Sequence, residues 1–483
     1  MAYSQGLALL MPYDNSCDRT FLSCSRGLCR DCGKIVEARY IALNNSVYLE
    51  RYCEEHGTSR AIVAESLAFY LDALAKDPGS VPPCKNLGLP TRPCPDACGP
   101  CSRHAQACHL PVFSITNACD LRCPICFTYN RSDLRYFMSE EEFIRQIDFV
   151  VESTGGVDLI NITGGEPTSH PNLCNLLRHA KRPEIGRITV NSNGRRLGRD
   201  PELARQLADL GVYVILSLDT FDPERSKVIH GIDITEDKKR ALEQLEKFNI
   251  PTTLLMVLIG GVNEDELKGL LDLTLTCDTV RSLTIQTMTY TGQGGRAFHP
   301  RKHIPVDGVV RRLTDIAEYG LTPSDFVSLP SAHPLCYQVS YLLRGTGNDW
   351  LPFSRILGED CLRDHFKDGY LIRPGPELEL ALKDAVLRLH GEGAEPRILS
   401  GIRSMLQRLY PTYESLTVHE RQRRAEGMVK TIYAHAHMDE DTFEIGRAMR
   451  CPDQVPVDAS RFIGACSYNL RYRKQDPRFW ETP

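Results

Sequence analysis

The chain has 483 residues, enough for two to four domains with a sizeable core. Apolar residues make up 42% and charged residues 25%, close to globular averages, which excludes a disordered or fibrous chain. The formal net charge of −5 comes with no long block of one sign, so composition gives no support to a nucleic-acid partner.

Nineteen cysteines are the unusual feature of this composition. Their share is below that of short disulfide-stapled chains, their number is odd, and the N-terminus lacks the basic start of a signal peptide. We therefore expect a reducing, cytoplasmic compartment, in which clustered cysteines are more often metal ligands than disulfides. The apolar runs 212–218 and 254–259 are too short for a membrane helix of about 20 residues, so no transmembrane segment is expected.

The first motif in chain order is a pair of knuckles, Cys29-x2-Cys32 and Cys53-x2-His56. Two such knuckles predict a tetrahedral zinc-ribbon or rubredoxin-like site. One imidazole among thiolates favours zinc slightly and leaves iron open. Either metal would hold together a small domain with little core of its own, which we place at residues 1–80.

A second cysteine-rich segment follows in a proline-rich stretch, which we interpret as a linker over residues 81–110. Its four thiolates are enough to close an auxiliary four-iron cluster, with a zinc site as the alternative. The predicted ligands are Cys94, Cys98, Cys101 and Cys108.

Between residues 111 and 300, apolar extended runs alternate with helical patterns. The predicted strands are 112–116, 157–163, 187–191, 212–218, 252–259 and 282–288. The predicted helices begin after a capping box at Ser139 and continue at 172–182, 201–210, 236–248 and 264–275. This α/β alternation predicts a parallel sheet, open or curled into a partial (β/α)6 TIM-like barrel. Ligands of such sheets bind at the carboxyl ends of the strands.

Three cysteines, Cys119, Cys123 and Cys126, follow the first of these strands with C-x3-C-x2-C spacing. Thiolates are the usual ligands of iron–sulfur clusters, and a cluster of four irons held by three cysteines keeps one iron open. An open position lets a substrate or cofactor bind the metal directly. From these residues alone, a zinc knuckle or part of a closed ferredoxin-type cluster is the alternative.

With Phe127 after it, this triplet resembles the signature of radical S-adenosylmethionine (AdoMet, SAM) enzymes. The resemblance implies that AdoMet chelates the open iron of a [4Fe-4S] cluster through its amino and carboxylate groups. An electron from the cluster then breaks the sulfonium bond, and the 5′-deoxyadenosyl radical so formed removes hydrogen from an unactivated carbon. It also implies an external electron donor such as flavodoxin or ferredoxin.

Residues after the later strands are predicted to contact AdoMet. The segment Gly164-Gly165-Glu166-Pro167 resembles the GGEP element of the family, which holds the AdoMet amino group. Its glycines allow close backbone approach, and Glu166 offers an acceptor to an ammonium. Further predicted contacts, for which ordinary turns are the alternative, are Asn191, Asn193, Ser217, Asp219 and Gly260.

The chain after residue 300 carries four more cysteines, the number that closes a cluster: Cys336, Cys361, Cys451 and Cys466. Their long spacing leaves unliganded core cysteine as an alternative. We expect residues 301–483 to hold a second auxiliary cluster and part of the substrate site. Basic runs at 420–430 and 471–474 are more often solvated faces, and they leave peripheral contact with a membrane open.

The order of these motifs, ending with Cys466 before Tyr468-Asn469, resembles one subgroup of radical AdoMet enzymes. That subgroup contains archaeal tetraether synthase, which joins lipid tails, and the class D radical SAM methylases. The resemblance implies carbon–carbon bond formation on a lipid-like or small-molecule substrate, by chain coupling or by methylation. A peptide-modifying radical enzyme is the nearest rival. A multi-cluster electron carrier or a zinc-ribbon binding protein is the rival of another class.

Overall fold

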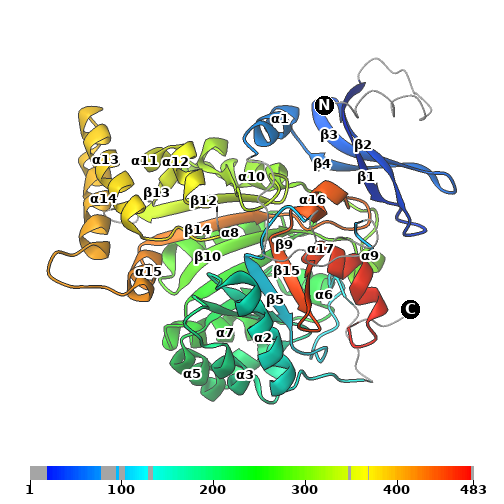
Figure 1. Cartoon of the computed structure of the whole chain (residues 1–483), viewed down its shortest axis with the longest axis horizontal. Coiled ribbons are helices and arrows are strands. Elements are labelled where there is room, and N and C mark those ends of the chain that lie inside the picture. Colours follow the sequence, from blue (N-terminus) through cyan, green and yellow to red (C-terminus); the bar gives the residue numbers. More distant parts are fainter. Residues whose placement is uncertain are drawn as a thin grey trace.

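The computed structural model describes residues 19–77, 94–96, 104–128, 134–345, 350–367 and 369–479. An antiparallel ribbon sheet begins it, in the order β1 (Arg19–Leu28), β2 (Ile35–Leu43), β3 (Ser46–Cys53) and β4 (Gly57–Ala64). Its buried face includes Val47 and Leu49, both 0% exposed, and packs against α1 (Leu67–Ala75). This small sheet lies at the right of Figure 1, apart from the large central sheet.

A twelve-stranded sheet forms the centre of the molecule (Figure 1). The six predicted strands lie side by side in chain order, and all five of their pairings are parallel. They are β5 (Leu110–Ser114), β6 (Ile160–Thr163), β7 (Ile188–Ser192), β8 (Tyr213–Ser217), β9 (Thr252–Leu258) and β10 (Val280–Thr287). This arrangement is the predicted partial (β/α)6 barrel.

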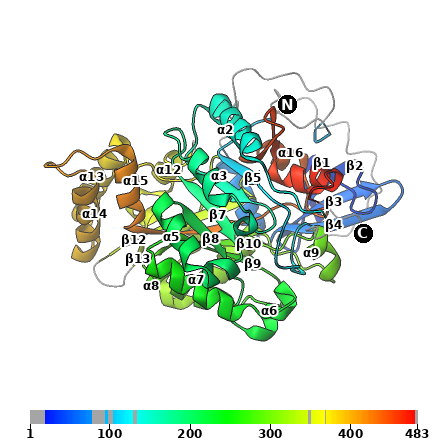
Figure 2. The same cartoon turned by 90° about the horizontal axis from the view of Figure 1, so that it is seen from below.

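Helices connect consecutive strands and cover one face of this sheet, the face nearest the viewer in Figure 2. The first, α2, begins after Ser139, whose hydroxyl accepts the Glu142 backbone N–H at 3.1 Å, and it buries Phe143 and Ile147 completely. No helix in the described part of the chain is long and apolar enough to cross a membrane. The connecting helices are α2 (Glu140–Thr154), α3 (Leu173–Ala180), α4 (Arg195–Arg199), α5 (Pro201–Leu210), α6 (Pro223–His230), α7 (Thr235–Lys247) and α8 (Glu266–Thr276).

Strands from the last third of the chain extend this sheet at both edges, an arrangement that the sequence analysis did not predict. At one edge β14 (Val429–His435) runs parallel to β10, and β12 (Tyr337–Arg344) pairs antiparallel with β14. At the other edge β15 (Asp453–Val457) runs parallel to β5 and pairs with β16 (Arg461–Gly464). The chain then turns through α17 (Ala465–Ser467) and the wide helical turn η4 (Tyr468–Tyr472).

The remaining elements all come from the chain after β10. Two short strands pair with β12, namely β11 (Val327–Ser328) and β13 (Trp350–Pro352). The helices are α9 (Gly292–Ala297), α10 (Val306–Thr314), α11 (Phe353–Leu357), α12 (Glu359–Asp364), α13 (Pro376–Gly391), α14 (Pro396–Leu409), α15 (Val418–Glu426) and α16 (Ile445–Met449).

An acidic loop at residues 439–442 fastens the ribbon to the barrel. The Arg51 guanidinium of the ribbon, 1% exposed, donates to the Glu440 carbonyl at 2.6 Å and to the Asp441 carboxylate at 3.3 Å. Arg301, in the chain after β10, donates to the same Asp441 carboxylate at 2.6 Å. Buried pairs of this kind are costly to break, because the partner left behind is an uncompensated charge. The loop therefore fixes the ribbon beside the carboxyl ends of the barrel strands.

A second junction between ribbon and barrel contains a buried carboxyl group. The Ser66 backbone N–H, just before α1, donates to the Asp307 Oδ2 at 2.9 Å. The other oxygen, Oδ1, is buried and has no hydrogen-bond partner in the described structure. Burial raises the pKa of Asp307 to about 6, from an ordinary value of 3.8.

This raised pKa predicts a pH-dependent stability. The native state binds its proton more tightly than the unfolded state, so stability falls as pH rises from about 4 to about 6. Asp307→Asn keeps the acceptor for Ser66 and removes the charge. We expect this variant to be more stable than the wild type at pH 7.5, by up to about 3 kcal/mol. The difference should shrink toward pH 5 in urea unfolding curves, and a difference that is constant with pH would contradict this account.

Candidate metal and cofactor site

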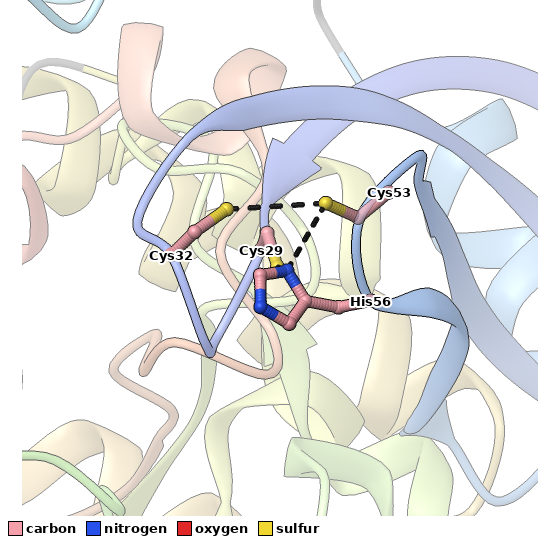
Figure 3. A group of neighbouring side chains, drawn as sticks. All are labelled: Cys29, Cys32, Cys53 and His56. Atoms are coloured by element: carbon pink, nitrogen blue, oxygen red, sulfur yellow. Dashed lines mark hydrogen bonds between the residues drawn. The ribbon is translucent and has the colours of Figure 1, made fainter.

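The ribbon knuckles bring four ligand atoms together (Figure 3). Cys29 and Cys32 follow β1, whereas Cys53 is the last residue of β3 and His56 lies in the turn before β4. The Cys32 and Cys53 sulfurs are 3.9 Å apart, and His56 Nδ1 lies 3.4 Å from the Cys53 sulfur and 3.7 Å from the Cys29 sulfur. With zinc–sulfur bonds of about 2.3 Å, ligands of a tetrahedral ion lie about 3.8 Å apart. These four residues therefore fit one tetrahedral metal ion without rearrangement.

Removing one ligand tests this site. Cys53→Ser should lose one equivalent of bound metal, measured by elemental analysis of the purified protein, and should lower the thermal unfolding temperature. The matched control is Cys24→Ser, because Cys24 is exposed on β1. That control should keep both properties. A Cys53→Ser protein with its full metal content would disprove the assignment.

The loop that follows β5 carries three further predicted metal ligands, Cys119, Cys123 and Cys126. The Cys126 backbone N–H donates to the Cys123 carbonyl at 3.0 Å, which closes a turn between the last two cysteines. Burial raises the pKa of Cys119 to about 12 and the pKa of Cys123 further, and the neighbouring sulfurs act in the same direction. Thiolates are the form that binds metal, so a metal must supply the charge that makes these buried thiols ionise.

Gly164 and Gly165 hold the end of β6 against this loop. The Gly165 N–H donates to the Thr116 carbonyl and the Glu166 N–H to the Ala118 carbonyl, both at 2.7 Å. A Cβ at Gly164 would lie 2.2 Å from the Thr116 carbonyl oxygen, and one at Gly165 would lie 2.3 Å from the Ala118 carbonyl oxygen. The close backbone approach predicted for these glycines is therefore made to the segment that precedes Cys119.

Glu166 is buried and already hydrogen-bonded. Its carboxylate accepts the Thr168 N–H at 3.1 Å and hydroxyl at 2.7 Å, the Ser192 hydroxyl at 2.9 Å and the Asn193 N–H at 2.7 Å. Burial raises the pKa of Glu166, and these donors oppose the rise. The carboxylate thus joins the ends of β6 and β7, and its contact with AdoMet stays a prediction. Pro167 begins the short helical turn η1 (Pro167–Ser169) that follows.

The other predicted cofactor residues lie at or near the same edge, because the strands are parallel. The Asn193 side chain donates to Asp120, beside Cys119, at 2.7 Å. Asn191 lies within β7, and its Oδ1 is buried with no hydrogen-bond partner in the described structure. Asp219 accepts the Val257 N–H of β9 at 2.7 Å, and burial raises its pKa to about 6. Ser217 is the last residue of β8, and Gly260 lies just after the end of β9.

Two residues that the sequence analysis missed lie beneath this edge. His230 Nδ1 is 3.7 Å from the Cys123 sulfur and its Nε2 is 3.5 Å from Asp219, while burial lowers the pKa of His230 to about 3. Lys238, 1% exposed, donates to the Ser217 carbonyl and, at 2.7 Å, to the Asn193 carbonyl. Neither residue belongs to a recognisable motif, since each is one of several polar residues in its helix.

The second predicted cluster is only partly described. Cys94 lies beside η4, because the Tyr472 hydroxyl donates to the Pro95 carbonyl at 2.8 Å. Cys108 is 4% exposed in the segment that leads into β5. Two of its four cysteines lie outside the described residues: Cys98 and Cys101.

Three of the four cysteines predicted for the C-terminal auxiliary cluster, Cys336, Cys451 and Cys466, lie in one neighbourhood, although they do not form a group of closely spaced ligand atoms among the described residues. Burial raises the pKa of Cys451 well above its usual value, and the neighbouring sulfurs of Cys466 and Cys336 add to this rise. Cys361 lies apart from them on α12, where burial and then Asp364 raise the pKa of its thiol. The predicted set of Cys336, Cys361, Cys451 and Cys466 therefore stays a prediction, and the neighbourhood of Cys451 includes Cys336 and Cys466.

Comparison with known proteins agrees with this architecture. Residues 113–274 match the radical SAM superfamily, and residues 21–65 match the HMPTM N-terminal zinc ribbon domain. The chain is also 30% identical to the GTP 3′,8-cyclase of Peptoclostridium acidaminophilum, over 46% of this chain and 69% of that protein. The chain belongs to the radical SAM superfamily, and it is a radical SAM enzyme.

One relative matches along nearly the whole length. The 7,8-dihydro-6-hydroxymethylpterin dimethyltransferase of Methanocaldococcus jannaschii is 22% identical, with 94% of this chain and 95% of that protein covered. Among solved structures, Streptococcus suis SuiB bound to precursor peptide SuiA shares 20% identity at a TM-score of 0.37, covering 44% of this chain and 46% of that chain.

Proposed function

We propose that this radical SAM enzyme methylates an unactivated carbon of a pterin or a chemically similar heterocycle, and so forms a carbon–carbon bond. The three neighbouring cysteines on the loop after β5 are the basis for the radical part of the proposal, since three thiolates leave one iron of a four-iron cluster open. The similarity to a pterin dimethyltransferase over 94% of the chain supports the methylation part.

In this proposal Cys119, Cys123 and Cys126 hold the cluster at the carboxyl edge of the sheet. When bound and reduced, the cluster supplies the electron that cleaves AdoMet. The chain positions AdoMet with the backbone of residues 164–167 and with Asn191, Asn193, Ser217, Asp219 and Gly260. Lys238 keeps the ends of β7 and β8 together beneath them. A cytoplasmic flavodoxin or ferredoxin would deliver the electron.

Cofactor cleavage tests the radical part directly. Anaerobically reconstituted protein given dithionite and AdoMet should release 5′-deoxyadenosine, measured by liquid chromatography. Cys126→Ala should reduce this release at least a hundredfold, because the cluster loses one of its ligands. Cys277→Ala is the control, since Cys277 lies at the end of α8 and its sulfur contacts Thr279 at 3.2 Å. Equal release from both variants would contradict the proposal.

A separate assay tests the substrate class. The protein is incubated with a hydroxymethylpterin and an isotopically labelled one-carbon donor, either AdoMet or a methylene-folate. Mass spectrometry should show a pterin product that is heavier than the substrate by the mass of one or more labelled methyl groups. Doubling of a lipid chain, or a cross-link in a peptide, would instead support one of the other carbon–carbon bond-forming reactions.

We also propose that Cys336, Cys451 and Cys466 hold an auxiliary iron–sulfur cluster. The support is electrostatic. Arg447 is 4% exposed, and its guanidinium donates to the Cys336 sulfur at 3.4 Å and to two backbone carbonyls, with no ion pair to a carboxylate in the described structure. A buried unpaired guanidinium is costly, and thiolates bound to a metal supply the negative charge that it lacks. His437 Nδ1 lies 3.6 Å from the Cys466 sulfur.

The pair of variants Cys451→Ser and Cys361→Ser tests this C-terminal auxiliary cluster. Iron and sulfide contents of the reconstituted protein should fall by up to one four-iron cluster for Cys451→Ser. They should stay unchanged for Cys361→Ser, because Cys361 lies apart on α12. A loss of iron in Cys361→Ser, or none in Cys451→Ser, would overturn the assignment.

A further inference from the structure

A buried arginine near the cluster loop forms no ion pair with a carboxylate among the described residues. Arg473 is 4% exposed, and it donates to the Asn469 side chain at 3.1 Å and to the Ser114 hydroxyl at 3.2 Å. No ion pair joins it to a carboxylate in the described structure, and the nearby Asp476 is bound by Arg478 at 2.8 Å. Neutral hydrogen-bond acceptors alone compensate a buried charge poorly.

Three aromatic rings surround this guanidinium. Its Cζ lies 4.9 Å from the centre of the Tyr468 ring, 5.3 Å from that of Phe479 and 5.6 Å from that of Phe127. Ring faces attract a cation, but they carry no net charge. The cage therefore holds the guanidinium in place and excludes water, and it does not neutralise the charge.

The cage places this cation beside the cluster loop. Phe127 directly follows Cys126, and Ser114 is the last residue of β5, the strand that leads into the loop. Burial lowers the pKa of Arg473, while Tyr468, the Cys126 sulfur and the Asp476 carboxylate in their ionised forms favour the charged guanidinium. A cluster bound by thiolates would bring net negative charge to this place.

We propose that Arg473 is the fixed counter-charge of the cluster held by Cys119, Cys123 and Cys126, and that it raises the reduction potential of this cluster. The inference rests on the cluster assignment made under the proposed function. Reduction adds one negative charge to the cluster, so a nearby cation stabilises the reduced state more than the oxidised state. Burial strengthens the effect because water does not screen it. Arg473 thereby brings the cluster closer to the potential of its electron donor.

The test is a redox titration of reconstituted protein, with the reduced cluster followed by electron paramagnetic resonance. The relevant signal is the one that changes when AdoMet is added, and no turnover is needed. Arg473→Gln keeps a hydrogen-bonding amide and removes the charge, so its midpoint potential should be more negative than that of the wild type. Arg473→Lys keeps the charge and should stay close to the wild type.

Arg478→Met is the matched control. The Arg478 guanidinium lies over the same Phe479 ring at 5.3 Å, but it is neutralised by Asp476 at 2.8 Å. This variant should leave the midpoint potential unchanged. An unchanged potential in a folded, iron-loaded Arg473→Gln protein would overturn the proposal.

Cluster retention separates the remaining outcomes. If Arg473→Gln loses the cluster and Arg473→Lys keeps it, the charge is required to hold the cluster, as proposed. If both variants lose it, the shape of the arginine matters rather than its charge, and the proposal is wrong. A wild-type protein without any signal that responds to AdoMet would contradict the proposed function itself.

Discussion

The cost of burying negatively charged sulfur is the constraint on which the rest of this structure depends. Within the cluster loop, burial raises the pKa of Cys119 to about 12. Thiolates persist there only if a metal and neighbouring cations compensate them. Two buried groups supply positive charge near that loop, Arg473 and Lys238, and neither forms an ion pair with a carboxylate in the described structure. The arrangement of the tail and of α7 around the loop follows from this requirement.

The N-terminal ribbon and the C-terminal segment that contains η4, here called the tail, come from opposite ends of the sequence and lie together beside the barrel. The loop 439–442 contacts both, because Arg51 of the ribbon donates to Asp441 and Lys474 of the tail donates to Glu440 at 2.7 Å. Arg471 of η4 reaches the ribbon knuckle itself and donates to the Gly33 carbonyl at 2.9 Å. A metal bound at the ribbon knuckles would therefore stabilise the surface that η4 contacts; Figure 1 shows the ribbon and the C-terminal helices on the same side of the molecule.

Residue spacing and hydrophobic alternation predicted those parts of the fold that are encoded within one short segment of the sequence. The six barrel strands, the cap at Ser139 and the ribbon ligands all follow from spacing and alternation. The strands β14 and β15 escaped prediction because they are buried on both faces, which removes the alternation, and because Lys430 and Pro456 interrupt their apolar character. Tertiary contact alone shows that His230 and Lys238 belong to the site and that Cys361 lies apart from the other tail cysteines.

The central claim is that one iron of the cluster after β5 has no protein ligand and is free to bind AdoMet. Electron–nuclear double resonance on the reduced protein, with AdoMet labelled with ¹⁵N at its amino group and ¹⁷O at its carboxylate, tests it most directly. The account predicts hyperfine coupling of both nuclei to the cluster. A cluster that forms and is reduced, yet shows no coupling to either nucleus at saturating AdoMet, would contradict it.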